Sequence, residues 1–429
     1  MKSSTMQSFV LLSIAFITQV GAFPQYANYN RQSTGNPNGD GYTNGAGNSN
    51  GDSTGAGNTN GESNAAMGTD HNSGLLGLGI PSNIDLAPIV SVGRKIIPDA
   101  EHEFMEPGPG DVRGLCPGLN IMANHGYIPR NGITDMTQLA YGLQEGLGLA
   151  PDFTLVLIAF ALKTCVDLTT LKMSIGRTDS RTDGPLSVLL GTAPGLFSAE
   201  AHNKYEIDGS LGGDDAYFAP GKRSHFNGTR WNRWRQIAVE KYDGVMSIPW
   251  NSEVRSIQYK ECRDMNPECH WAVVDQFAFY AAQNLISTLI PSSEENGKPG
   301  PALVDTIDTF FGFHKDSTGQ YTHGSSRFPP GSSGVWYRRT VPHTFPEFVE
   351  AGIASLAPHF PIFGSNNGAL GTWNADPVQI NTVADVNLIC LILNQFTNVD
   401  DTRYGGVAKD ALKLLLGNLT SVLRHNSGC

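Results

Sequence analysis

Residues 113–132, with the sequence RGLCPGLNIMANHGYIPRNG, place a cysteine directly before a proline and ahead of a stretch that can form a short helix. Proline is favoured at the first position of a helix, where its missing N–H would have no partner in any case. Cys116 would then lie at the positive end of the helix, where backbone N–H groups and the helix dipole favour a thiolate. Such a cysteine is suited to be a metal ligand or a nucleophile. An ordinary buried or paired cysteine remains the alternative.

The six cysteines of the chain allow many disulfide pairings, and sequence alone does not choose among them. Placement favours Cys390 with Cys429, which would pin the end of the chain to the core. It also favours Cys262 with Cys269, which would close the loop ECRDMNPECH. Cys165 lies in an apolar helical stretch and is expected to be a buried free thiol. The cysteine of the quoted stretch is then left without an obvious partner.

The N-terminal part of the chain is not expected to belong to the fold. Residues 1–22 have a lysine near the start, an apolar run and small residues at the expected cleavage site, which is the pattern of a cleaved secretory signal peptide. Residues 23–74 consist mainly of Gly, Asn, Ser, Thr and acids, and they offer too little apolar area to offset the entropy of ordering the backbone. We expect a disordered tether there, either a spacer or a wall- or matrix-binding segment, and a folded domain over residues 75–429.

Charge and hydropathy exclude two classes of function. A net charge of −11 argues against a nucleic-acid-binding surface, and no segment of the mature chain is long and apolar enough for a membrane span. A secreted, extracellular protein is therefore expected. The sequons at Asn227 and Asn418 are candidate glycosylation sites in that compartment.

The hydrophobic periodicity predicts a mostly α-helical domain with long loops. Residues 134–149 have helix-capping residue types at their start, and residues 151–168 begin with proline and are apolar nearly all round. Residues 275–290 and 385–398 show the same apolar pattern, whereas strand-like alternation between tight turns is scarce.

Two further stretches place these features in a family. Residues 109–139, which contain the Cys-Pro pair, and residues 186–218, which contain YEIDGS and follow MSIGR, resemble the fungal haem-thiolate peroxidases, the chloroperoxidase and unspecific peroxygenase family. The resemblance covers roughly residues 98–429 and includes the C-terminal cysteine pair of the longer peroxygenases. It implies a single helical domain that binds haem b through Cys116, with Leu115 where the family has a proline. A thiolate ligand favours cleavage of the O–O bond of bound hydrogen peroxide, and small organic substrates are then oxidised or oxygenated.

The resemblance also implies a metal site beside a haem propionate. Glu206, the carbonyl of Ile207 and Ser210 are hard oxygen donors suited to Mg²⁺ or Mn²⁺. Glu206 and Ser210 would share a face if this segment were helical. A surface glutamate and a capping serine are the alternative. Asp208 between them is expected to have a structural, hydrogen-bonding part.

The chain departs from the family where peroxide cleavage needs a proton carrier. The family places a glutamate on an apolar helix with an arginine seven residues before it, and the matching positions here are Gln283 and Gln276. An amide cannot shuttle a proton. The chain is therefore either an active peroxidase or peroxygenase with altered proton delivery, or a haem-binding protein with weak or no turnover. A disulfide-stabilised protein without haem is a more distant alternative.

Aromatic and aliphatic residues near these positions are candidates for a substrate channel. They are Tyr205, Phe277, Tyr280 and Ile286, although such side chains are more often part of a core. His125, close to the Cys-Pro pair, is expected to be a packed, hydrogen-bonding histidine rather than a catalytic one.

Overall fold

The computed structural model describes residues 80, 81, 84, 95–197, 207–220, 226–293, 297–330, 335–380, 388–399, 403–427 and 429. All of them belong to one compact unit, Ser73–Cys429. The predicted signal peptide and tether lie outside the described residues, and so do Tyr205 and Glu206.

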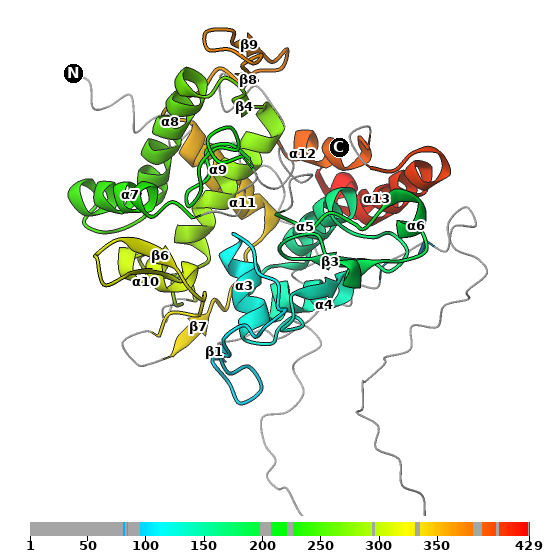
Figure 1. The fold of residues 1–429 in the computed structure, drawn as a ribbon, viewed down its shortest axis with the longest axis horizontal. Coiled ribbons are helices and arrows are strands. Elements are labelled where there is room, and N and C mark those ends of the chain that lie inside the picture. Colours follow the sequence, from blue (N-terminus) through cyan, green and yellow to red (C-terminus); the bar gives the residue numbers. More distant parts are fainter. Residues whose placement is uncertain are drawn as a thin grey trace, which may run out of the picture. The chain divides into compact units, whose positions relative to one another are not determined.

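The described chain is mostly α-helical, as predicted (Figure 1). The longer helices are α5 (Pro151–Thr164), α7 (Gly228–Lys241), α8 (Ile248–Met265), α9 (Val273–Thr288), α11 (Phe345–Leu356), α12 (Leu388–Thr397) and α13 (Gly406–Ser427). The shorter ones are α3 (Pro117–Asn124), α4 (Met136–Tyr141), α6 (Ser187–Leu190), α10 (Val304–Phe311), the π-helix η1 (Gly142–Gly146) and the 3₁₀-helix η2 (Ser180–Thr182).

Short antiparallel strands tie the loops together. Strand β1 (Lys95–Ile97) pairs with β7 (Trp336–Arg338), and β2 (Ile133–Asp135) pairs with β3 (Lys172–Ser174). Strand β8 (Gly364–Ser365) lies between β4 (His270–Trp271) and β9 (Asn374–Ala375), and β5 (Phe313–Lys315) pairs with β6 (Tyr321–His323).

The helix predicted over residues 134–149 is in fact three elements. Its first residues belong to β2, Asp135 forms a capping box with Gln138 at the start of α4, and a π-helix follows. The π-helix contains Gly146, where a Cβ atom would lie 2.3 Å from the sulfur of Met122. Close packing against α3 therefore requires a glycine here, and glycine weakens a regular helix. The other predicted helices are confirmed with shifted ends.

Helix α9 is the central element of the core and buries polar side chains, Gln276, Gln283 and Asn284, beside its apolar ones. It packs against α8 and α11, and these helices lie side by side in Figure 1. A Cβ atom at Gly352 of α11 would lie 2.9 Å from the Cβ of Ala281 and 3.0 Å from the ring of Phe277. The glycine lets the two helix backbones approach closely, so α9 is held in a fixed position.

Both predicted disulfides are present. Cys390 in α12 is bonded to Cys429, and Cys262 at the end of α8 is bonded to Cys269. Cys165 is a buried free thiol, as predicted, and Cys116 is also free. Among the described helices, none combines the length and the apolar character that crossing a membrane requires.

Candidate active site

Cys116 lies at the N-terminus of α3, as the Cys-Pro pair predicts. It is the N-cap residue, in an extended conformation, and Pro117 occupies the first turn. Burial raises the pKa of the Cys116 thiol, and the nearby backbone N–H groups of Leu119 and Gly118 oppose that rise. The protein thus holds a free thiol where backbone donors already stabilise negative charge on sulfur.

The loop that carries Cys116 is clamped by a residue that the sequence analysis missed. The side chain of Asn120 accepts from Gly114 N (3.1 Å) and donates to Gly114 O (2.8 Å), and so it pairs with the backbone as another strand would. Gly114 also passes close to a neighbouring segment, because a Cβ there would lie 2.2 Å from the ring of Phe197 and 2.6 Å from Ile175 O. A polar residue one turn after a helix N-cap would have been the only signal in the sequence.

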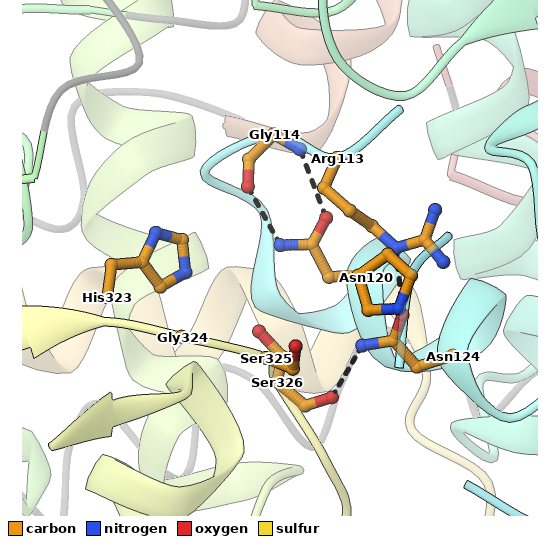
Figure 2. A pocket seen from close by; sticks show the side chains of 9 residues that line it. Arg113, Gly114, Asn120, Asn124, His323, Gly324, Ser325 and Ser326 are labelled. Carbon is orange, nitrogen blue, oxygen red and sulfur yellow. Dashed lines mark hydrogen bonds between the residues drawn. The ribbon is translucent and has the colours of Figure 1, made fainter. Parts of the chain in front are cut away.

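A polar pocket of about 270 Å³ borders this loop (Figure 2). It is lined by Pro107, Arg113, Gly114, Asn120, Asn124, His323, Gly324, Ser325 and Ser326. Arg113 Nε donates to Asn124 Oδ1 (2.8 Å), and Asn124 Nδ2 donates to Ser326 O (2.8 Å). Cys116 is not among the lining residues. The pocket therefore belongs to the support of the loop and does not open onto the sulfur.

The segment with the predicted metal ligands is not helical where it is described. Residues 207–220 form bends and turns, and Gly209 has a φ of +78°. Ile207 and Ser210 therefore do not lie on a helix, and the idea of a shared helix face is wrong for this part of the segment. Ser210 Oγ accepts from Gly213 N (3.0 Å), which fixes its side chain in a turn.

Asp208 has the hydrogen-bonding part that was predicted for it. The buried carboxylate accepts from His270 N (3.1 Å), Asn266 Nδ2 (3.3 Å) and Ala216 N (3.4 Å). These donors come from the loop closed by Cys262 and Cys269, from β4 and from the segment itself. Asp208 thus anchors the segment to the core and uses its oxygens for this purpose.

Gln276 of α9 is engaged in the same anchor. Its buried side chain donates to Asp208 O (3.1 Å) and His270 O (3.2 Å) and accepts from Arg255 Nη2. The side chain is therefore held by three hydrogen bonds to other parts of the core. These contacts give Gln276 a structural role in the core.

Gln283 lies two turns further along α9 and is only partly satisfied. Its Nε2 donates weakly to Gln258 Oε1 (3.4 Å), while its Oε1 is buried and has no partner among the described residues. Asp275, the acidic residue of this helix, lies instead beside His270, with 3.5 Å between Nε2 and Oδ2. Hydrogen bonding to Asp275 raises the pKa of His270. The helix therefore presents an amide, and no carboxylate, at Gln283.

Arg255 of α8 is a buried cation that the sequence analysis did not single out. It is fully buried, and no carboxylate of the described residues lies within ion-pair distance of it. The guanidinium donates to Gly209 O (2.9 Å), to Gln258 Oε1 (3.1 Å) and to Gln276. Burial lowers the pKa of Arg255 to about 10. A charged residue on the stripe of α8 that faces the core was the available signal.

Comparison with known proteins identifies the family. The family described as Peroxidase, family 2 matches residues 102–341, which is more than half of the chain. The chain belongs to this family.

Individual relatives agree with the assignment. The chain is 29% identical over 351 residues to the dothistromin biosynthesis peroxidase dotB of Dothistroma septosporum, covering 75% of this chain and 80% of that protein. It is 29% identical over 303 residues to the aromatic peroxidase fscJ of Fusarium equiseti (67% and 64%). It is 27% identical over 316 residues to the aromatic peroxygenase of Cyclocybe aegerita (73% and 76%). This family-2 peroxidase is thus an oxidoreductase of the haem-thiolate type that acts with peroxide on organic substrates.

The residues of this family-2 peroxidase fit a haem with a cysteine ligand. Cys165, the other free thiol, lies at the end of α5, and its sulfur donates to Ala161 O. Burial raises the pKa of Cys165 to about 12, and the side-chain hydrogen bond with Thr164 offsets this rise only in part. The orphaned Oε1 of Gln283 is a second sign of a missing group, because buried polar atoms normally have a partner.

The remaining predicted residues have these surroundings. Phe277, Tyr280 and Ile286 are buried, with Phe277 between α9 and α11 and the hydroxyl of Tyr280 bonded to His359 Nε2 (2.8 Å). Their part in a channel stays a prediction. His125 is packed and its Nδ1 lies 2.9 Å from His102 O, as expected.

The two sequons differ in their accessibility. Asn227 caps α7, and its Nδ2 donates to Asp214 (2.8 and 3.0 Å), whereas Asn418 is exposed on α13. Glycosylation at either position stays a prediction.

Proposed function

We propose that this family-2 peroxidase is a secreted haem-thiolate peroxidase or peroxygenase that uses hydrogen peroxide to oxidise or oxygenate small organic substrates, and that the thiolate of Cys116 would hold haem b. The observation that carries the proposal is the free thiol of Cys116 at the N-cap of α3, beside the backbone N–H groups of Gly118 and Leu119. When bound, the thiolate-ligated haem supplies the electron density that favours O–O cleavage.

The protein's own residues would prepare the thiolate in two ways. The two N–H groups stabilise negative charge on the sulfur and so favour the thiolate over the thiol. The pairing of Asn120 with Gly114 fixes the two ends of the loop, so the sulfur keeps one position. Pre-positioning lowers the cost of ordering the ligand when haem binds.

Gln283, whose Oε1 has no partner among the described residues, would face bound peroxide, whereas Gln276 is held by the core. The free Oε1 of Gln283 can accept a hydrogen bond from peroxide or water and so orient it, but an amide cannot take the proton. Proton transfer then falls to water or to peroxide itself. The second function, a haem-binding protein with weak or no turnover, is favoured by this amide alone.

The metal site of the proposal consists of Glu206, the Ile207 carbonyl and Ser210, with Mg²⁺ or Mn²⁺ and a haem propionate. Support comes from Asp208, whose oxygens are taken by N–H donors, and from the fixed turn at Ser210. Bound waters would complete the octahedral shell that Mg²⁺ demands. Metal analysis of the holoprotein and of Glu206→Gln tests this, because the variant should lose both metal and haem.

Two further points of the proposal concern secretion. The two disulfides fit an oxidising compartment, and the exposed side chain of Asn418 suits glycan attachment better than the engaged side chain of Asn227. Determination of the N-terminus after secretion tests cleavage near residue 22. Mass spectrometry before and after deglycosylation tests the two sequons.

The reduced protein with carbon monoxide tests the central proposal. A thiolate-ligated haem should give a strongly red-shifted Soret band, and Cys116→Ala should abolish it. Cys165→Ala is the matched control, because it removes the other free thiol and should leave the band in place. An unchanged band in Cys116→Ala would exclude this ligand. Peroxide consumption by the wild-type holoprotein then separates an enzyme from a haem-binding protein.

A further inference from the structure

We propose that Trp373 is a second, surface site of oxidation, which is connected to α9 by a chain of oxidisable rings, Tyr280, Trp271 and Tyr259. This inference rests on the proposed function, because the oxidising equivalents come from hydrogen peroxide. The substrates would be electron-rich phenols too bulky to enter a buried pocket.

The inner end of the chain is built for the loss of an electron together with a proton. Tyr280 lies on α9 one turn before Gln283, and its hydroxyl is hydrogen-bonded to His359 Nε2 (2.8 Å). Burial lowers the pKa of His359 to about 4, so the imidazole is neutral at pH 7 and its nitrogen is free to take the proton. Ser252 Oγ lies 3.3 Å from the other ring nitrogen, Nδ1. An oxidised phenol is far more acidic than imidazolium, so the proton moves to His359.

The middle of the chain consists of neighbouring rings in the core. The guanidinium carbon of Arg255 lies 4.5 Å from the ring centre of Tyr280 and 4.4 Å from that of Trp271. Trp271 and Tyr259 have ring centres 5.6 Å apart, and Tyr259 and Trp373 have ring centres 6.1 Å apart. Electron transfer slows exponentially with distance, so several short steps between such rings are much faster than one long step.

Arg255 affects which indole of the chain carries the charge. Its buried positive charge disfavours a second positive charge on the adjacent indole of Trp271, because like charges in a low-dielectric interior repel strongly. Trp373 lies further along the chain and is partly exposed, so water stabilises the charge there. The charge therefore does not rest on Trp271, and of the two indoles in the chain Trp373 is the one at which it is better stabilised.

The outer end of the chain is accessible. Trp373 lies in the connection between β8 and β9, next to the exposed residues Thr372 and Asn374. Ile362, whose backbone N–H and C=O bond the Tyr259 hydroxyl (3.2 and 3.1 Å), is 55% exposed. An exposed aliphatic side chain beside the terminal pair of rings suits a phenol with an apolar ring.

The reaction balances with two phenols for each peroxide. Each phenol loses one electron to oxidised Trp373 and one proton to water, and becomes a phenoxyl radical. The two electrons and two protons reduce one hydrogen peroxide to two waters. Tyr280 passes its proton to His359 when it is oxidised and takes it back when it is re-reduced. Trp271, Tyr259 and Trp373 lose and regain an electron only, so no ring is consumed.

The test compares a small free phenol with the same phenol attached to a dextran, using the full-length holoprotein. Trp373→Phe and Tyr259→Phe should each slow oxidation of the attached phenol by about tenfold or more and leave that of the free phenol unchanged. Trp373→Tyr, which keeps an oxidisable ring, should retain most of the rate. Tyr217→Phe is the matched control, since Tyr217 is exposed but lies outside the chain.

Electron paramagnetic resonance after rapid mixing with peroxide gives a readout other than turnover. The wild type should show an indole radical that is absent in both Trp373→Phe and Tyr259→Phe. Equal oxidation of attached phenol by wild type and both variants, or a radical that persists in both, would overturn the inference. If the wild type oxidises the free phenol only, the second site fails alone. Failure with both phenols would overturn the proposed function, and the second site with it.

Discussion

The loop around Cys116 and the polar face of α9 are built in different ways. The thiol loop is local: Gly114, Gly118, Leu119 and Asn120 lie within six residues of one another and supply its geometry. The α9 face depends on distant segments, since Gln276 bonds to Arg255, Asp208 and His270. Hydrogen bonds within one short stretch can be predicted from its sequence motif. Hydrogen bonds between distant segments can change even when the motif is kept. The predicted departure of the chain from its family, at Gln276 and Gln283, lies on this face.

The largest expected effect is a gain in the rate of peroxide consumption from a substitution on α9. Gln283→Glu supplies the missing proton carrier and should raise the rate of peroxide consumption by a visible part of about 10²–10⁴-fold, measured by stopped flow. Gln258→Glu is the matched control: its carboxylate would pair with Arg255 Nη1, which lies 3.1 Å from the present Oε1, and should leave the rate unchanged. A wild type that is already fast and does not respond to Gln283→Glu would show that another group serves as the proton carrier.

The second effect tests the long-range character of the α9 face. Gln276→Arg should destabilise the fold by about 3 kcal/mol, because it places a second buried guanidinium against Arg255 without a compensating charge. Urea unfolding measures this loss. The double variant Gln276→Arg with Arg255→Gln exchanges the two partners and should recover a large part of the stability. Equal stability of wild type and Gln276→Arg would mean that the two side chains are not in contact.

The third effect tests the local character of the thiol loop. Asn120→Ala leaves Gly114 N and Gly114 O without their buried partner and should cost about 2 kcal/mol in unfolding free energy. Asn120→Asp keeps an acceptor for the N–H but turns a buried carboxylate toward Gly114 O, so its cost should be at least as large. The same stability for wild type and Asn120→Ala would show that the loop holds Cys116 without this clamp.

The smallest effect is the pH dependence of stability. Burial lowers the pKa of His359 to about 4 and that of His343 to about 3, from 6.5. The unfolded chain therefore binds more protons below about pH 6.5, and stability should fall as the pH falls toward 4. Each histidine contributes a slope of up to about 1.4 kcal/mol per pH unit. In His343→Asn, the unfolding free energy should fall less steeply as the pH is lowered. An unchanged dependence on pH would contradict a neutral, buried His343.

Sequence reasoning succeeded where the physical cause was local or simple. The proline after Cys116 predicts the start of α3, apolar stretches predict α5, α9 and α12, and placement predicts both disulfides. It failed where a neighbouring segment decides the conformation. The π-helix arises because Gly146 packs on Met122, and the turn at Ser210 arises because Asp208 is bonded to Asn266 and His270.

The anchor of Asp208 has a consequence for producing the protein. Asn266, which donates to both Asp208 and Asp215, lies in the eight-residue ring closed by Cys262 and Cys269. In a reducing cytosol this ring opens, and the residues that follow Asp208 lose their fixed support. Expression in such a host is expected to yield mainly apoprotein that cofactor added later reconstitutes poorly. Folding in an oxidising compartment should give a fully loaded preparation.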